Sequence, residues 1–260
     1  MKSPRTIVVT GASGGIGMPL CTSLAKGGAF LILCGRDHFR LGTLAEKLRL
    51  QNGIRPMILT FDFGVPESIR NAVTKLKART NALDGFAMIP PRIAACSDCT
   101  PHDQEWRSLF EENFIGPLSL IRGCLPLLSR RKRSKVVLVS ALSSTQLVPK
   151  FATSGVIRAA WQAEIKALAF AHGAHGVHFN TVSLGSVLTS KNLARLKRSA
   201  RRTEVNIETL MKAQTANVPL ARYAAPENVA LVLETMLSGF SDHLTGVNIL
   251  CDGGFTRSYR

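Results

Sequence analysis

A glycine-rich segment near the start of the chain, Thr10-Gly11-Ala12-Ser13-Gly14-Gly15-Ile16-Gly17, constrains the fold more than any other feature. It follows a β-branched, apolar run at 5–10 that is typical of a buried strand, and it precedes a helical segment at 18–26. Glycines at such a turn let the main chain approach a pyrophosphate, which the N-terminus of the helix then binds. The segment therefore predicts a dinucleotide site formed by Gly11, Ser13, Gly14, Gly15, Ile16 and Gly17.

Strand-like and helical segments alternate along the rest of the chain. Further strands are predicted at 30–34, 57–61, 85–89, 135–140, 177–183 and 246–250, and further helices at 38–50, 66–80, 103–128, 151–172 and 226–237. This alternation predicts an α/β fold with a Rossmann-like, doubly wound parallel sheet of seven strands. Since no linker or repeat divides the chain, we expect a single domain over 1–260, with a flexible basic flap at about 186–216.

The end of the second predicted strand indicates which dinucleotide binds. An acidic residue there would bind the adenosine ribose of NAD, but this chain has Gly35-Arg36 instead. A guanidinium suits a 2′-phosphate, so we predict NADP(H), the alternative being that Arg36 is an ordinary surface arginine. Asp62, after the third strand, is expected beside the adenine, with Phe63 next to it in the same site.

These motifs resemble the short-chain dehydrogenase/reductase family over essentially the whole chain, and look closest to its 3-oxoacyl-carrier-protein reductases and related ketoreductases. Further matches are Asn113 in EENFIGPL, Gly185 at the end of GVHFNTVSLG, Thr189, and the segments 219–230 and 244–255. The resemblance implies that Gly185 and Thr189 contact the cofactor and that Asn113 belongs to the catalytic site. It also implies tetramers that associate through the helices at 103–128 and 151–172.

The catalytic motif departs from the family pattern. Family reductases use a YxxxK pair, in which the tyrosine gives a proton to the substrate and the lysine lowers its pKa and holds the nicotinamide ribose. Aligning KFATSGVIRAAW with this motif places Phe151 at the tyrosine position and Gly155 at the lysine position. The two tyrosines, Tyr223 and Tyr259, lie outside any such motif. Standard carbonyl reduction is therefore predicted to be lost or severely weakened.

The catalytic serine of the family also lacks a clear counterpart. Ala141 falls at its usual position, with Ser140 just before it, and Ser143 or Ser144 is an alternative. The NNAG motif after the fourth strand is replaced by Met88-Ile89-Pro90-Pro91, which predicts a different loop.

Two cations near the motif are candidates to contact the cofactor or an anionic substrate. Arg158 lies one helical turn beyond Gly155, and Lys150 precedes Phe151. In so basic a chain, we interpret both as surface charges.

Composition restricts the remaining possibilities. The net charge is +16, from 33 lysines and arginines against 17 acids, with basic clusters at 130–135 and 191–202. Such charge favours acidic partners, but no nucleic-acid motif accompanies it. The six cysteines are expected to be thiols, and Cys96 and Cys99 with His102 lack the partners of a complete metal site. Without a signal peptide or a membrane-spanning run, the protein is expected to be cytoplasmic and without membrane contact.

Two functions of different class remain, besides a nucleic-acid-binding derivative that charge alone supports. The first is an enzyme that acts on a small-molecule or carrier-protein-tethered acyl thioester or polyketide-like substrate. Its chemistry would be residual reduction, or cyclisation, dehydration or isomerisation, and the basic flap would attract the anionic carrier. The second is an inactive pseudo-reductase that serves as a partner or regulatory subunit, as a homo-oligomer or together with an active relative.

Overall fold

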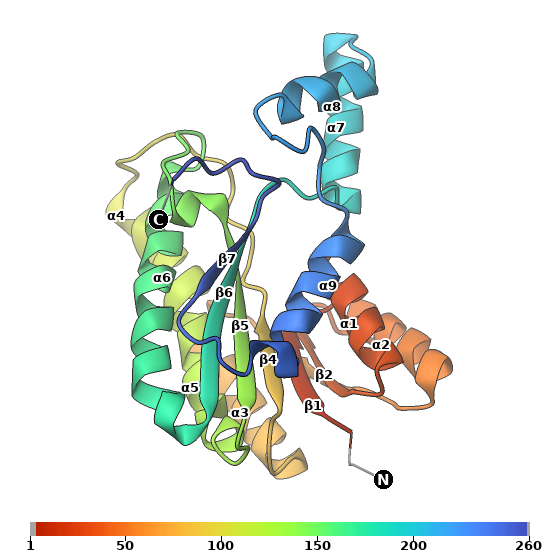
Figure 1. Cartoon of the computed structure of the whole chain (residues 1–260), viewed down its shortest axis with the longest axis vertical. Coiled ribbons are helices and arrows are strands. Elements are labelled where there is room, and N and C mark those ends of the chain that lie inside the picture. The colour runs from red at the N-terminus through yellow and green to blue at the C-terminus, as the bar shows by residue number, and fades with distance from the viewer. Residues whose placement is uncertain (1–3, 259–260) are drawn as a thin grey trace.

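The computed structural model describes residues 4–258, which form a seven-stranded parallel sheet in the order β3-β2-β1-β4-β5-β6-β7 (Figure 1). This confirms the doubly wound sheet predicted from the alternating segments. The strands are β1 (Thr6–Thr10), β2 (Phe30–Gly35), β3 (Met57–Thr60), β4 (Gly85–Met88), β5 (Ser134–Ala141), β6 (Val177–Leu184) and β7 (Asn248–Cys251).

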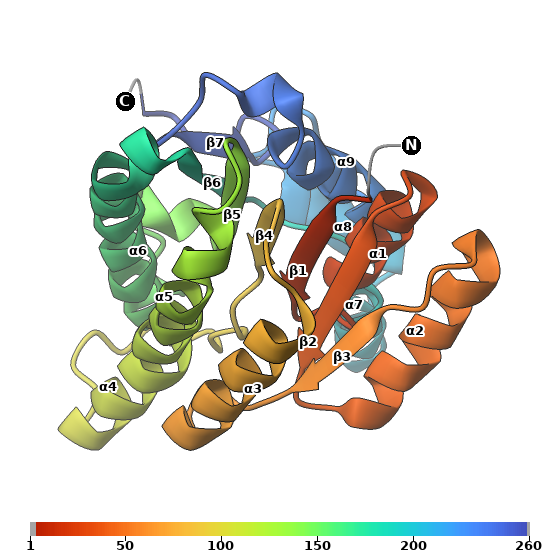
Figure 2. The ribbon, with the colours of Figure 1, turned by 90° about the horizontal axis from the view of Figure 1, so that it is seen from below.

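Apolar residues on both sides of each central strand bury the sheet between two helical layers. In β1, Val8 packs toward one layer, whereas Ile7 and Val9 pack toward the other. Because a fully covered parallel sheet needs apolar side chains on both faces, these strands are nearly continuous apolar runs. One layer contains α3 (Pro66–Arg79), α5 (Gly116–Leu128) and α6 (Ala152–His172), and the other contains α1 (Gly17–Lys26), α2 (His38–Asn52) and α9 (Pro226–Met236) (Figure 2).

The direction of winding reverses between β1 and β4, which are neighbours in the sheet. The loops that follow these two strands leave toward opposite faces and open a crevice at the carboxyl ends of the strands. The register of the strands aligns their carboxyl ends, since Val9 of β1 pairs with Leu33 of β2 and with Ala87 of β4. The glycine turn, which follows β1, therefore lies beside this crevice.

The helix predicted at 103–128 is divided. It consists of α4 (Asp103–Phe110), a π-helical segment η1 (Glu111–Ile115), and α5. A Cβ on Gly116 would lie 2.2 Å from the main-chain oxygen of Phe63, so glycine is needed for this close approach. The wide turn of a π segment often occurs at functional sites, and here it contains Asn113.

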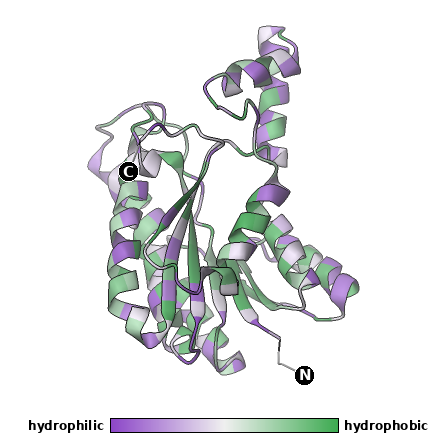
Figure 3. Ribbon diagram, viewed as in Figure 1, coloured by the Kyte–Doolittle hydropathy of each residue, from purple (hydrophilic) through white to green (hydrophobic). Residues whose placement is uncertain are grey.

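The predicted flap consists of two helices, α7 (Ser190–Thr203) and α8 (Ile207–Thr215), which project beyond the carboxyl end of the sheet (Figure 1). Figure 3 shows that hydrophilic residues predominate there, in contrast to the strands. The apolar residues Leu196 and Ala200 are buried, whereas the basic side chains of Lys197, Arg198 and Arg201 are exposed. None of the helices within 4–258 is long and apolar enough to span a bilayer.

Candidate functional site

The glycine turn after β1 is closely packed. Gly11 has φ +57°, and its carbonyl accepts a hydrogen bond from the Gly14 N–H at 2.9 Å. A Cβ on Gly17 would lie 2.2 Å from that same carbonyl oxygen, so any side chain there would force the turn open. The turn thus brings the N-terminus of α1 directly to the crevice, which is the arrangement that binds a phosphate.

Thr189, at the start of the basic flap, packs against this turn. A Cβ on Gly15 would lie 2.7 Å from the Thr189 Cβ, so the glycine allows the two segments to touch. The Thr189 hydroxyl accepts a hydrogen bond from the Asn192 N–H at 3.2 Å and caps α7. The structure therefore joins two predicted cofactor residues that lie far apart in the sequence.

Two arginines follow β2 at the edge of the crevice. Arg36 is 72% exposed and lies 3.7 Å from the Asp62 carboxylate, which leaves most of its hydrogen-bonding capacity available. Arg40, in the first turn of α2, donates to the main-chain oxygen of Ser13 at 2.9 Å. Arg40 was not among the residues predicted for the site, although a basic residue one turn after the strand-end arginine is a usable signal for an anion site.

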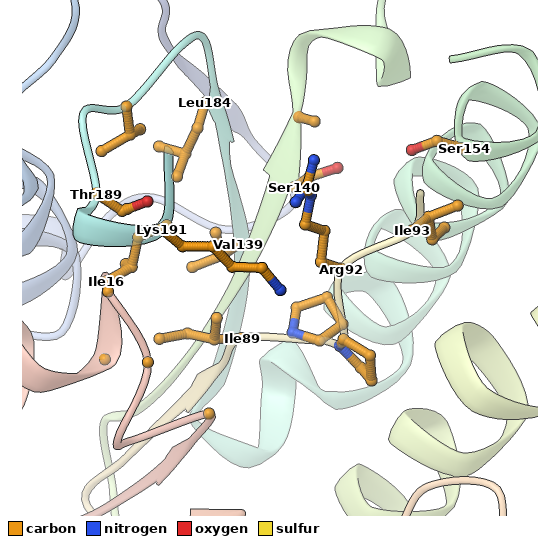
Figure 4. A pocket seen from close by; sticks show the side chains of 18 of the residues that line it. Ile16, Ile89, Arg92, Ile93, Val139, Ser140, Ser154, Leu184, Thr189 and Lys191 are labelled. Carbon is orange, nitrogen blue, oxygen red and sulfur yellow. The ribbon is translucent and has the colours of Figure 1, made fainter. Parts of the chain in front are cut away.

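A cavity of about 660 Å³ extends from the glycine turn to the start of α6 (Figure 4). The residues at its wall come from the ends of β1, β2, β4, β5 and β6, and from α6 and α7. Among the predicted site residues, Ser13, Asn113 and Gly155 are not part of the wall. Those that line it are Gly11, Gly14, Gly15, Ile16, Gly17, Arg36, Asp62, Phe63, Ser140, Ser143, Phe151, Gly185 and Thr189.

Two serines near the end of β5 present buried hydroxyls, Ser140 within the strand and Ser143 just after it. Ser140 and Ser143 are 5% and 8% exposed, and neither hydroxyl has a hydrogen-bond partner within the described residues. Ser144 instead bonds to the Ser183 hydroxyl at 2.9 Å, so it is engaged in the sheet rather than in the cavity. Of the three serines considered from the sequence, the structure brings Ser140 and Ser143 to the site.

Asn113 lies in the π-helical segment and is 2% exposed. Its main-chain oxygen accepts a hydrogen bond from the Trp161 indole N–H at 2.7 Å, whereas its side-chain Oδ1 has no partner among residues 4–258. The hydrogen bond fixes η1 against α6.

Phe151 and Gly155 occupy different environments. Phe151 immediately precedes α6, is paired through its main chain with Cys96, and lines the cavity. Gly155 is not at the cavity wall, and a Cβ there would meet the Ser143 main-chain oxygen at 3.5 Å. The structure therefore does not bring both residues to the cavity.

The interpretation of Arg158 as a surface charge was wrong. Its side chain is part of the cavity wall, and the residue is 7% exposed. Its Nη1 and Nη2 lie 3.5 Å from the main-chain oxygens of Val139 and Pro91, while its Nε has no partner within the described residues. Burial lowers the pKa of Arg158 to about 10, so the side chain remains charged at neutral pH.

The cavity is strongly cationic. Its wall contains six basic side chains against the two acids Asp62 and Glu112, and the basic ones are Arg36, Arg92, Lys150, Arg158, Lys191 and Arg195. Figure 4 shows Lys191, at the start of α7, extending into the space that Ser140 and Thr189 border. In contrast to Arg158, Lys150 is exposed, as expected from the sequence. This arrangement attracts anions such as phosphates, carboxylates and developing oxyanions.

The loop after β4 is built differently from an NNAG loop. The Thr10 hydroxyl accepts from the Ile89 N–H at 2.7 Å and lies 3.0 Å from the Ile89 oxygen. This side chain ties β1 to β4, and Pro90-Pro91 then turns along the cavity wall. The prolines remove two main-chain donors from the site.

The remaining candidates lie elsewhere. Cys96 and Cys99 are free thiols, and no group of three metal-binding side chains occurs within residues 4–258. Tyr223 is 8% exposed and donates to Gln214 Oε1 at 2.7 Å, away from the cavity wall. Tyr259 lies outside the described residues.

Comparison with known proteins identifies the family. A family model described as enoyl-(acyl carrier protein) reductase matches residues 11–256. The chain belongs to this family of short-chain dehydrogenases/reductases. Dehydrogenase/reductase SDR family member 7B of Danio rerio is 26% identical over 194 residues, which cover 73% of this chain and 63% of the relative. The matched part is thus less than two thirds of that relative.

Solved structures show the same fold. L-sorbose reductase from Gluconobacter frateurii, in complex with NADPH and L-sorbose, superimposes with a TM-score of 0.93 at 22% identity, over 98% of both chains. A short chain oxidoreductase from Pseudomonas aeruginosa PAO1, described as containing an atypical catalytic center, gives a TM-score of 0.90 at 24% identity, again over 98% of both chains.

Proposed function

We propose that the protein binds NADP(H) in the crevice and acts on an acyl-type carbonyl substrate without a tyrosine–lysine pair. The glycine turn beneath Arg36 is the observation that carries this proposal. It combines a helix N-terminus open to a pyrophosphate with a guanidinium at the end of β2. When bound, NADP(H) supplies a hydride to a carbonyl carbon.

The residues present fit such a cofactor. A Cβ on Gly15 would lie 2.7 Å from the Thr189 Cβ, and a Cβ on Gly17 would lie 2.2 Å from the Gly11 oxygen. Glycine at both positions therefore shapes the turn that receives the pyrophosphate. Arg36, with Arg40 nearby in sequence, would bind the 2′-phosphate, and Asp62 and Phe63 would border the adenine. Gly185 and Thr189 would border the nicotinamide half of the cofactor.

The substrate end of the cavity supports an acyl substrate, either free or tethered to a carrier protein. Ile93, Phe151 and Leu184 give this region apolar walls, while the surrounding cations favour an anionic or strongly polarised substrate. The exposed basic residues of α7 would attract an acidic carrier and raise its encounter rate. Residual reduction, cyclisation, dehydration and isomerisation are all compatible with such a pocket.

Nucleotide titration tests the cofactor proposal. NADPH should bind more tightly than NADH, measured by the fluorescence of the reduced nicotinamide. Arg36→Ala should reduce the ratio of the affinities for NADPH and NADH by about 10–100-fold, since a hydrogen bond to a charged group contributes roughly 1.5–3 kcal/mol. Arg198→Ala, on the exposed side of α7, is the matched control and should leave the preference intact. The proposal fails if millimolar NADPH neither binds nor raises the melting temperature.

A second candidate is a catalytically inactive member that binds the cofactor and serves as a partner or regulatory subunit. The observation that favours it is the lack of tyrosine in the cavity wall formed by residues 4–258. Association would use α4, α5 and α6, with copies of the chain or with an active relative. Liquid chromatography with mass spectrometry of 3-oxoacyl substrates incubated with protein and NADPH separates the two candidates. Reduction and dehydration change the substrate mass and isomerisation changes its retention time, whereas an inactive member changes neither.

A further inference from the structure

Arg158 is a buried cation without a counter-ion. No acidic side chain within the described residues forms an ion pair with it, and its Nε donor is unsatisfied. Its two remaining contacts are at the 3.5 Å limit of a hydrogen bond. Burying a charge in this way is costly unless a partner arrives, so the side chain is positioned for an oxygen-rich ligand group in the cavity.

Ser154 lies one helical turn before Arg158 on the same face of α6. It is 6% exposed, lines the cavity, and its hydroxyl has no side-chain hydrogen bond within the described part of the chain. Figure 4 shows the Ser154 hydroxyl pointing toward the space that Ser140 borders from β5. A hydroxyl and a cation four residues apart on one face of α6 therefore both line the cavity.

We propose that Ser154 and Arg158 supply the hydroxyl and the fixed cation of this site, and that together they bind the carbonyl oxygen of the substrate. The pair begins three residues after Phe151, with the same spacing as Phe151 and Gly155. Of these four residues, Gly155 is the one that does not line the cavity. This inference rests on the proposed binding of NADP(H) at the neighbouring glycine turn.

The two side chains would divide the work on that oxygen. As a hydride adds to the carbonyl carbon and forms its new C–H bond, the π pair of the C=O bond moves to the oxygen, which gains negative charge. Arg158 stays protonated and stabilises this charge, because a fixed cation in a water-poor site needs no reorganisation. Ser154 Oγ–H donates first a hydrogen bond and then its proton to the oxygen, giving the hydroxyl product, and water returns a proton to Ser154 Oγ. Serine is a weaker acid than tyrosine, so the reaction should be slow.

A pair of double variants tests the assignment. Ser154→Tyr with Arg158→Lys should raise kcat/KM for NADPH-dependent reduction of acetoacetyl-N-acetylcysteamine, a neutral 3-oxoacyl thioester, by at least about tenfold over the wild type. The matched double variant, Phe151→Tyr with Gly155→Lys, introduces the same side chains three residues earlier and should give no such gain. A gain in the second variant and none in the first would overturn the assignment.

A measurement without turnover keeps the inference testable if the tyrosine does not fit. Arg158→Met should weaken binding of the same thioester to the NADP⁺-loaded protein at least about tenfold, measured by calorimetry. It should also raise the melting temperature of the ligand-free protein by about 2–4 °C, because it removes an unpaired buried charge. A structural arginine would lower that temperature instead.

Arg198→Met is the control for the change in net charge, since this exposed side chain on α7 does not line the cavity. The inference is refuted if Arg158→Met binds the thioester as tightly as the wild type, or if it melts at a lower temperature than the wild type. The titration of the wild type with NADPH does not depend on the roles proposed for Ser154 and Arg158. Tight NADPH binding with a failed Arg158 test therefore refutes this inference alone, whereas failed NADPH binding refutes the proposed function.

Discussion

Gly17→Ala is the most direct test of how the glycine turn works. The new Cβ would lie 2.2 Å from the Gly11 carbonyl oxygen and 2.8 Å from the Ala12 Cα. Both neighbours are main-chain atoms, so no side-chain rotation relieves the overlap, and the atoms must separate by more than about 1 Å to reach a normal contact. The N-terminus of α1 would then move away from the position in which its N–H groups meet a pyrophosphate.

The expected cost follows from the overlap. Overpacking of this kind destabilises by about 1–3 kcal/mol. The entropy of unfolding of a chain of 260 residues is roughly 0.5 kcal/mol per degree, so the melting temperature should fall by about 2–6 °C. Affinity for NADPH should fall at least about tenfold, since a displaced helix terminus loses hydrogen bonds to a charged group. Calorimetry and nucleotide fluorescence measure the two effects.

Gly42→Ala is the matched control. Gly42 lies within α2, and a Cβ there would have no neighbour within 4 Å. Because alanine favours a helix by up to about 1 kcal/mol over glycine, this variant should melt about 1–2 °C higher, with unchanged affinity for NADPH. If Gly17→Ala melts and binds NADPH like the wild type, the close approach at the turn is not what holds the site together, and the reasoning is wrong.

Two further predictions concern stability away from the cavity. Asp37 accepts a hydrogen bond from the Arg40 N–H at 3.0 Å and caps α2. Asp37→Ala should therefore cost about 0.5–2 kcal/mol of stability and lower the melting temperature by about 1–4 °C. Asp37→Asn, the control, should retain most of the cap. The hydrogen bond from buried Lys135, followed by that from Arg133, holds the pKa of Asp242 below its usual value. Since that pKa is depressed in the folded state, the stabilisation is complete above about pH 4 and is lost as the pH falls through the folded-state pKa. In denaturant titrations, the free energy of unfolding of Asp242→Asn should fall less steeply with decreasing pH than that of the wild type. Equal slopes for the two proteins would contradict the assignment.

Local patterns were sufficient to predict the sheet. The strand β1, for example, is apolar on both faces, and it is followed at once by glycines, so its place as a buried strand of a parallel sheet could be inferred without the structure. The helix at 103–128 was harder, because a π-helical segment keeps the same apolar spacing while it changes the direction of the side chains. The close approach of Gly116 to Phe63, 53 positions earlier, is a tertiary contact that no local pattern records.

The candidate site also has one part that local sequence predicts and one part that depends on tertiary structure. The glycine turn is contiguous in sequence, so the role proposed for it could be predicted from residue types alone. The start of α6 offers two pairs of residues with identical spacing, at 151 and 155 and at 154 and 158, and the motif was aligned with the first pair from the sequence. Rotation of the helix decides between them, since a shift of three residues turns a side chain by about 300° and changes which side faces the cavity.

Arg158 also shows why a basic composition misleads. With 33 lysines and arginines in the chain, the statistical expectation for any one of them is a solvated position. Arg158, in the cavity wall, departs from that expectation, since it is buried, unpaired and at the limit of hydrogen-bond distance from its neighbours. Such a residue destabilises the empty fold, and a local violation of packing rules is characteristic of a functional position. On this argument, the side chain that is expected to cost the ligand-free protein stability is the one that we propose binds the substrate carbonyl oxygen.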